Sequence, residues 1–278
     1  MTGTIRYSRA SDKDALKEIW SACFDDSPAA IDDFLSRICP EGRSAVMEYG
    51  GKCVSAFHIV SAGLIFPGGD CIGLDYLYAL GTLPEMRGHG FGSAAASFCA
   101  EASLLRGRIA ALVPADAGLR QWYQKSAGLT PAFSVCEMTC TASKRSTDVL
   151  PMSAHEYFSA RGQMLGDIPH AVLPEKMFCW SERYSPAAFF CSLPEYRGCA
   201  FAEKYGSRLV ISELLVPDGK APQAAAELCQ ASGCSDAVFR TPACGKCASG
   251  EGTCGAVLCV SPQTLSLPKD AWFGPFFD

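Results

Sequence analysis

The sequence lacks any apolar run near the roughly 18 residues that a membrane-spanning helix needs. Residues 1–10 contain no apolar core of a secretion signal, so we expect a cytoplasmic protein without a membrane partner. An excess of positive charge is also missing, because 24 Lys and Arg stand against 29 Asp and Glu, a net charge of −5. This balance offers no electrostatic footprint for nucleic acid, and we expect no such partner.

Charged residues are scarce at 19%, but the 49% of hydrophobic residues excludes a disordered or fibrous chain. At roughly 150 residues per domain, 278 residues predict about two domains. The 16 cysteines are scattered through apolar segments such as 98–100 and 190–192. We therefore interpret them as free thiols used as small core residues and not as a disulfide framework.

The order of the predicted elements indicates an α+β fold. For the first domain, 1–141, they are strands at 4–10, 44–49, 53–66, 71–83, 109–113 and 133–141 and helices at 11–24, 28–38, 88–105 and 117–126. A polar segment at 142–152 is typical of a linker. In the second domain, 153–278, a capped helix begins after Ser153, and the later strands and helix repeat the order of the first half in degenerate form.

The most informative segment is 76–93, in which a strand ends at Pro84 and a glycine-rich loop opens a helix. Closely spaced glycines at a helix start let backbone N–H groups converge on an anion such as a pyrophosphate. A tight turn without a ligand is the alternative. A dinucleotide fingerprint belongs in the first βα unit, and a Walker loop needs Gly-Lys-Ser/Thr, which is absent here.

The segment Pro84 to Ser93 resembles the acetyl-CoA loop of the GNAT superfamily of N-acetyltransferases, Arg/Gln-x-x-Gly-x-Gly/Ala, through Arg87, Gly90 and Gly92. The resemblance covers residues 4–141 and, more faintly, 153–278. The two-part layout looks like the enhanced-intracellular-survival type without its sterol-carrier-like domain. It implies an N-terminal GNAT fold, with a mixed, mostly antiparallel sheet flanked by helices, followed by a degenerate GNAT-like domain.

The resemblance also implies which residues bind acetyl-CoA. Leu80 and Thr82 would bind the pantetheine arm through their backbones. The pyrophosphate would lie on the backbone amides of the loop, with the Ser93 hydroxyl adding to them. This pyrophosphate loop consists of Arg87, Gly88, His89, Gly90, Phe91, Gly92 and Ser93. We expect the His89 side chain itself to face solvent.

Downstream, residues 119–129 resemble the family segment Leu-Tyr-x-Lys-x-Gly-Phe. Tyr123 would then be the general acid that protonates the departing CoA thiolate. Gly128 follows Tyr123 by five residues where the family has four, and Leu129 replaces Phe. The alternative is that Trp122 and Tyr123 only pack the helix on the sheet.

Among candidates for a general base, Asp75 leads because it opens the central strand, and a strand-end cap is its alternative role. Glu48, His58 and Glu137 are candidates only by their polarity within strands. The aromatic tail 272–278 suggests either a docking strap or a terminal carboxylate that enters the active site.

A structural zinc site on the late cysteines is the competing signal. The four thiols would come from Cys244, Cys247, Cys254 and Cys259. The Cys-x4-Cys spacing of the second pair, the absence of a completing histidine and the apolar run 256–260 disfavour it, so we expect no metal.

These observations lead to an acetyl-CoA-dependent N-acetyltransferase, in which a neutral amine attacks the thioester directly. The alternative is a non-catalytic module that binds acyl-CoA or a partner. The acceptor is expected to be an amine on a small molecule or peptide, and a homo-oligomer is left open.

Overall fold

The structure is a computed structural model and describes all residues except 1–2, 243–252, 262–266, 269–270, 276 and 278. It divides into two compact units. Unit 1 comprises 1–63, 72–132 and 258–266, and unit 2 comprises 64–71, 133–257 and 267–278. Most divisions between the two units fall within strands, whereas the sequence predicts domain boundaries at 141 and 153.

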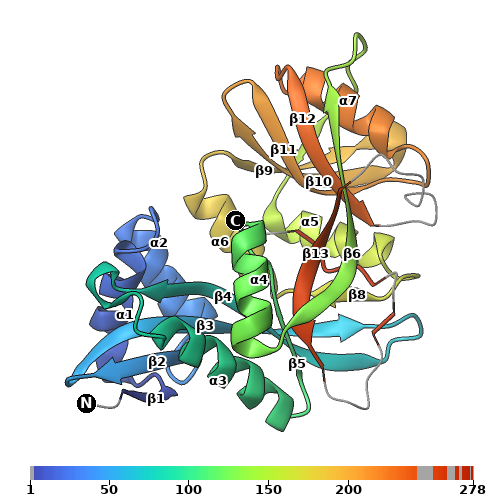
Figure 1. Ribbon diagram of the computed structural model, residues 1–278. Helices are drawn as coiled ribbons and strands as arrows, with labels where there is room; N and C mark the ends of the chain where they lie inside the picture. The colour runs from blue at the N-terminus through green and yellow to red at the C-terminus, as the bar shows by residue number, and fades with distance from the viewer. Residues whose placement is uncertain (1–2, 243–252, 262–266, 269–270, 276, 278) are drawn as a thin grey trace. The chain divides into compact units, whose positions relative to one another are not determined.

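Unit 1 contains most of the elements predicted for the first half of the chain (Figure 1). They are β1 (Thr4–Tyr7), the 3-10 turn η1 (Ala10–Asp12), α1 (Lys13–Ser21), α2 (Pro28–Asp33), the π-helical turn η2 (Phe34–Ile38), β2 (Ser44–Tyr49), β3 (Lys52–Ile65), β4 (Cys71–Thr82), the 3-10 turn η3 (Pro84–Met86), α3 (Phe91–Leu105), β5 (Ile109–Leu112) and α4 (Ala117–Ala127). The sheet order is β1-β2-β3-β4-β5, followed by the end of β13 (Thr253–Val260). β4 and β5 are parallel, whereas β1–β2, β2–β3 and β5–β13 are antiparallel.

Local sequence signals explain the ends of these elements. Gly50 and Gly51 have positive φ angles of 60° and 79°, which suits the tight turn between β2 and β3. Asp116 caps α4 by accepting the Leu119 N–H at 2.7 Å, and Gly128 ends that helix at φ 64°. Gly50 and Gly51 thus fix where β3 begins, while Asp116 and Gly128 fix the two ends of α4.

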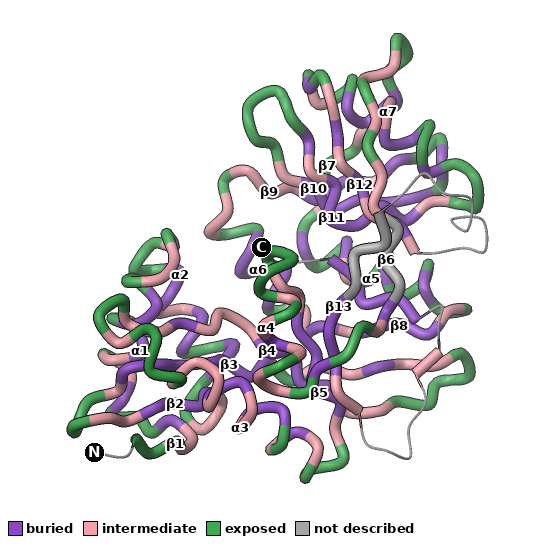
Figure 2. The backbone as a smooth tube through the Cα atoms, viewed as in Figure 1, coloured by how far each residue is buried: buried purple, intermediate pink, exposed green. Residues whose placement is uncertain are grey.

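The core of unit 1 lies between the sheet and α3. The buried face of α3 consists of small side chains, Ala95, Ala96 and Cys99, which let the helix pack closely on Phe57 and Leu77 of the sheet. Figure 2 shows this buried backbone along β3, β4 and β5. The helix is therefore held firmly, with its N-terminus at the predicted loop.

Unit 2 contains the elements of the second half. They are β6 (Thr130–Thr141), which starts in unit 1, β7 (Leu150–Met152), α5 (Ala154–Met164), β8 (His170–Val172), α6 (Glu175–Tyr184), β9 (Ala188–Leu193), the 3-10 turn η4 (Pro194–Tyr196), β10 (Gly198–Tyr205), β11 (Arg208–Leu215), α7 (Ala221–Ala231) and β12 (Asp236–Pro242). The sheet order is β6-β12-β11-β10-β9-β7. Only the β11–β12 pairing is parallel among these neighbours in the described chain.

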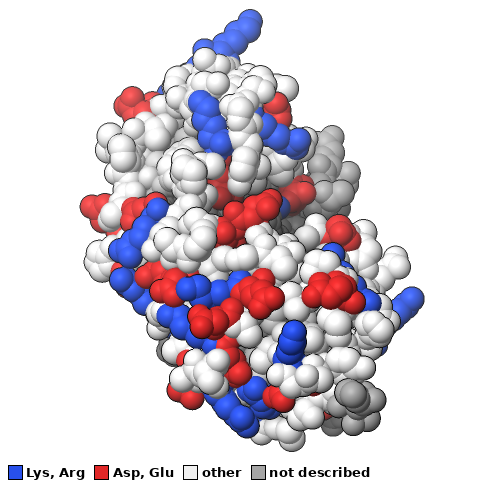
Figure 3. All heavy atoms as spheres, turned by 90° about the vertical axis from the view of Figure 1, so that its left-hand side faces the viewer, with Lys and Arg blue, Asp and Glu red and all other residues white. Residues whose placement is uncertain are grey.

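The fold is α+β, with mixed, mostly antiparallel strand pairing and flanking helices, as predicted. The described cysteines are free thiols. No helix in the described part of the chain is long and apolar enough to cross a membrane. On the face displayed in Figure 3, acidic and basic side chains are interspersed.

Candidate cofactor-binding and active site

The central strand separates from its parallel neighbour partway along its length. β4 pairs with β5 only from Leu74 to Tyr76, opposite residues 109–111. β4 then continues to Thr82, and Ala79 within it has a left-handed φ of 51°. A non-glycine residue with positive φ inside a strand marks a local break in the pleat. The later β4 residues therefore have no backbone partner on β5.

The predicted pyrophosphate loop follows directly after this strand. Gly88 and Gly90 both have φ 81°, and a Cβ added at either would have open space around it. Within the described chain, no backbone N–H of residues 88–93 donates a hydrogen bond to protein, while the Ala94 N–H already bonds the Gly90 carbonyl at 3.0 Å. Unpaired N–H groups at the start of a 15-residue helix form an anion site. The loop therefore fits a pyrophosphate.

Side chains around the loop hold it against the end of β4. The Arg87 Nε donates to the Thr82 carbonyl at 3.1 Å, and the Thr82 hydroxyl lies 2.9 Å from that of Ser55. A Cβ at Gly92 would lie 3.4 Å from Thr82 Oγ1 and 3.6 Å from the Trp122 ring. Thr82, Arg87 and Gly92 therefore lie close together at the end of β4 and the start of α3.

The remaining predicted cofactor residues lie at the same end of α3 or on β4. The exposed His89 ring stacks on Phe91 with centroids 5.7 Å apart. The Ser93 hydroxyl lies 3.1 Å from that of Ser126 on α4, and a hydroxyl can keep this bond while contacting a second group. Leu80 lies in β4 and packs its side chain on the core.

Tyr123 belongs to the buried core of unit 1. Its ring stacks on Phe57 with centroids 6.3 Å apart, and Leu77 and Leu112, the first residues beyond the β4–β5 pairing, are in the same cluster. Its hydroxyl bonds no described residue. Burial, with a smaller contribution from Cys99, raises the pKa of Tyr123 well above the usual value for a phenol. The ring of Tyr123 thus packs in the core, while its protonated hydroxyl makes no hydrogen bond to any described residue.

Asp75 has a different environment from that of a general base. Its carboxylate is fully buried and accepts hydrogen bonds from Ser103 (2.8 Å), Arg106 (2.9 Å) and Arg108 (3.0 Å). Ser103 lies near the C-terminal end of α3, about 20 Å along the helix from the Gly90 loop at 1.5 Å per residue. Asp75 lies inside β4 and is paired with Ala110, so it neither opens the strand nor caps its end, and these contacts give it a structural role as a buried hydrogen-bond acceptor.

The other base candidates also have partners. Glu48 accepts from Arg6 at 3.1 Å, and Glu137 accepts from Arg240 at 2.8 Å. His58 is buried and lies 2.7 Å from the Ser44 hydroxyl, and burial lowers its pKa to about 3. Each of these side chains thus lies within hydrogen-bond distance of a side chain on the neighbouring strand.

Sequence reasoning missed two neighbours of the loop. The sequence predicts Trp122 either in the core or beside Tyr123, whereas its ring borders Gly92. The Cys23 thiol, just after α1, donates to the Thr82 carbonyl at 3.4 Å and lies 3.7 Å from an Arg87 guanidinium nitrogen. Cys23 is separated from Thr82 by 59 positions, and no spacing in the sequence links the two.

Three of the four cysteines predicted for a zinc site have side chains that lie outside the described part of the structure. Cys244 and Cys247 lie outside the described residues, and the side chain of Cys254 is not described. Cys259 is buried in β13, and burial raises the pKa of its thiol to about 12. In the described part of the chain, no three His, Cys, Asp or Glu side chains are grouped to hold a metal.

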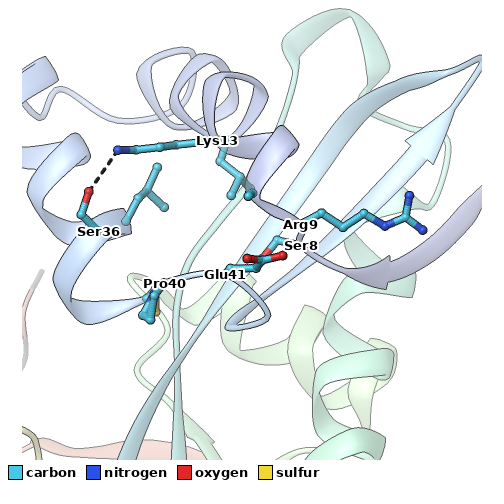
Figure 4. Close-up of a pocket in the computed structure, with 10 residues that line it drawn as sticks. Ser8, Arg9, Lys13, Ser36, Pro40 and Glu41 are labelled. Atoms are coloured by element: carbon cyan, nitrogen blue, oxygen red, sulfur yellow. Dashed lines mark hydrogen bonds between the residues drawn. The ribbon is translucent and has the colours of Figure 1, made fainter.

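A cavity of about 220 Å³ lies near α1 and η2 in unit 1. Figure 4 shows the residues that line it. Lys13 and Ser36 face each other across it with a hydrogen bond of 3.0 Å, while the Arg9 side chain extends away. None of the predicted site residues lines this cavity. It is therefore separate from the loop at α3.

Residues 4–119 match the family described as acetyltransferase (GNAT) domain. The match includes the loop and ends four residues before Tyr123. No curated protein matches the chain in sequence.

Solved structures resemble the chain over most of its length. A GCN5-related N-acetyltransferase from Kribbella flavida has 16% identity and a TM-score of 0.64, covering 93% of this chain and 70% of that one. A second from Anabaena variabilis has 14% identity and a TM-score of 0.68, with 93% and 72% covered. Eis1 from Mycobacterium abscessus has 15% identity and a TM-score of 0.61, with 85% and 65% covered. At these identities the likeness concerns the fold alone, and it extends beyond residues 4–119 into the second half of the chain.

Proposed function

We propose that this protein is an acetyl-CoA-dependent N-acetyltransferase that transfers the acetyl group to a primary amine by direct attack. The observation that carries the proposal is the row of unpaired backbone N–H groups at residues 88–93, at the N-terminus of α3 within a GNAT domain. An anionic pyrophosphate would compensate these donors and the positive end of the helix dipole.

The chain would hold acetyl-CoA with residues from two elements. The loop from Arg87 to Ser93 would bind the pyrophosphate, and the backbones of Leu80 and Thr82 would bind the pantetheine arm along the part of β4 that has no β5 partner. Acetyl-CoA supplies the activated acyl group. The protein supplies alignment of the two reactants and backbone donors near the carbonyl oxygen.

Tyr123 is the proposed proton donor to the departing sulfur. Its raised pKa keeps the proton on the hydroxyl throughout the neutral range, and no described residue competes for it. We assign no fixed carboxylate as the base, because the Asp75 oxygens are already bonded to Ser103 and two arginines. The amine would lose its proton to water.

The cofactor test is a calorimetric titration with acetyl-CoA. Gly90→Glu places bulk and negative charge in the loop and should abolish saturable binding. Gly107→Glu is the matched control, because Gly107 also has a positive φ and open space but lies beyond the other end of α3. Failure of the folded wild type to bind acetyl-CoA would refute the proposal.

The second candidate is a non-catalytic acyl-CoA-binding or partner-binding module. The burial of Tyr123 in an apolar cluster and its shifted spacing from Gly128 favour this candidate. A panel of polyamines, aminoglycosides and peptides, assayed by release of free CoA thiol, separates the two. Turnover with any of these amines supports the enzyme, and binding without turnover supports the module.

A further inference from the structure

Unit 2 repeats the framework that positions the loop in unit 1. β10 and β11 are antiparallel, α7 follows β11, and β12 returns parallel to β11. The β11–β12 pairing runs only from Arg208 to Ile211, opposite 236–239, and β11 continues to Leu215 without it. The segment 216–220 therefore occupies the same topological position as the loop before α3.

This second position has a different chemistry from the first. The connecting segment has no pair of closely spaced glycines, and the Lys220 N–H bonds the Pro217 carbonyl at 3.1 Å. Pro222 in the first turn of α7 has no N–H to donate. A backbone cradle like that of residues 88–93 is therefore not formed here, and charged side chains decide what the site can bind.

A pocket of about 440 Å³ lies at this position, within the range of small-molecule sites. Its lining residues are Arg145, Glu195, Tyr196, Arg197, Pro217, Lys220 and Gln223. Three of them are cationic and one is acidic, and the adjoining carboxylate of Glu227, which accepts from Tyr196, makes the sum 3 − 2 = +1 in a chain whose net charge is −5. Such a local excess of positive charge, opposite in sign to the whole protein, favours an anionic ligand.

The charges of the pocket are only partly compensated by the protein. Arg145 pairs with Glu195 and lies 3.7 Å from Glu227. Arg197 and Lys220 are exposed and make no ion pair with any residue that the structure describes. These two cations both line the pocket, and they come from separate elements, one just after η4 and one at the start of α7.

We propose that this pocket is a second anion site, which binds a phosphate or pyrophosphate group of a small molecule. Arg197 and Lys220 supply the positive charge, and the positive end of the α7 dipole adds to it. The pocket is large enough for the group that carries the phosphate to lie against Tyr196 and Pro217. All residues that line the pocket belong to unit 2, so the pocket shares no residue with the loop at 88–93 in unit 1.

The experiment is a calorimetric titration of the full chain with inorganic pyrophosphate, in the Gly90→Glu background so that the first loop cannot contribute. Arg197→Asn combined with Lys220→Gln removes both free charges, and Asn tolerates the left-handed φ of 48° at position 197. Lys204→Gln is the control, since it removes one charge from β10 outside the pocket. Circular dichroism checks that each variant is folded.

We expect saturable binding of one pyrophosphate per chain, weakened at least tenfold by the double substitution and by raising the salt concentration, and unchanged in Lys204→Gln. Tighter binding of ADP than of pyrophosphate would identify a nucleotide as the source of the phosphate, and equal binding would identify the free anion. The proposal is wrong if the folded background protein binds no pyrophosphate at millimolar concentration, or if the double substitution leaves the affinity unchanged.

Discussion

Arg161 and Glu213 form an ion pair inside unit 2, with 2.8 Å between Arg161 Nε and Glu213 Oε2 and side-chain exposures of 2% and 0%. The Tyr157 hydroxyl and the Trp272 indole N–H donate to the same carboxylate. Removing one partner would leave a buried charge uncompensated. The cluster thus binds the C-terminal segment at Trp272 to the core, as the docking alternative for the tail predicts, while Asp278 lies outside the described residues.

Gly274→Ala should destabilise the protein by about 2–4 kcal/mol. Gly274 has φ 107°, and an added Cβ would overlap the Arg161 guanidinium. Urea unfolding, followed by fluorescence of the buried Trp272, measures the change. Gly162→Ala is the control, because its Cβ meets nothing within 4 Å in α5, and it should be neutral or slightly stabilising. Equal stabilities of the two variants would contradict the buried role of the cluster.

Asp75→Asn should lower the free energy of unfolding by about 1–3 kcal/mol, because a neutral amide cannot accept all the hydrogen bonds that the buried carboxylate accepts from Ser103 and two partly exposed arginines. Ser103→Ala, which removes one neutral donor, should cost about 1 kcal/mol. Chemical unfolding gives both values. In the fraction that remains folded, kcat/KM should be unchanged. A hundredfold loss of kcat with an altered acid limb of the pH profile would instead make Asp75 the base.

Tyr123→Phe should lower kcat by a factor of about 10² to 10⁴, the usual contribution of a general acid. KM and thermal stability should remain close to the wild type, because the ring is kept and its hydroxyl bonds no described residue. Tyr49→Phe, at a ring that packs on Phe91, is the matched control and should retain full activity. Unchanged turnover in Tyr123→Phe would exclude the phenol from the reaction.

The pH dependence of the same step follows from the raised pKa of Tyr123. A general acid acts in its protonated form, so its contribution is present below its pKa and lost above it. Because burial raises that pKa above the usual value of 10, the phenol should not limit kcat between pH 7 and 10. An alkaline fall in kcat near pH 8 that disappears in Tyr123→Phe would contradict this assignment.

His58 should make the stability of the fold fall in weak acid. Its pKa is about 3 when folded and 6.5 ordinarily, so below pH 6.5 the unfolded chain binds a proton that the folded chain does not. The stability from the neutral ring is therefore complete above pH 6.5 and declines by about 1.4 kcal/mol per pH unit toward pH 3. Unfolding titrations between pH 4 and 7 should show a smaller slope in His58→Gln. Parallel slopes would refute the prediction.

Several elements could be predicted from local signals. Gly50 and Gly51 indicate the hairpin, Pro84 indicates the end of β4, and Ser153 indicates the capped start of α5. Each signal acts over a few residues through backbone sterics or one hydrogen bond, so it can be interpreted without the rest of the chain. The loop at 88–93 was predictable for the same reason.

The roles of single polar residues could not be predicted in this way. Asp75 has the position of a base in the sequence, but its partners Arg43, Arg106 and Arg108 come from distant segments. Cys23 and Trp122 reach the loop only because α1 and α4 pack beside the end of β4 and the start of α3. Partners of a charge or a ring depend on packing between elements, which spacing along the chain does not contain.

By itself, the sequence determined the α+β order of elements, the glycine-rich start of α3 and the small residues that let this helix lie close to the sheet, since these follow from local backbone preferences and side-chain size. Only the tertiary structure decided that β4 leaves β5 after Tyr76, that Asp75 is enclosed by arginines and that Arg197 and Lys220 line one pocket. Those relationships arise from strand register and from the close approach of residues far apart in the chain, and only folding brings them into contact.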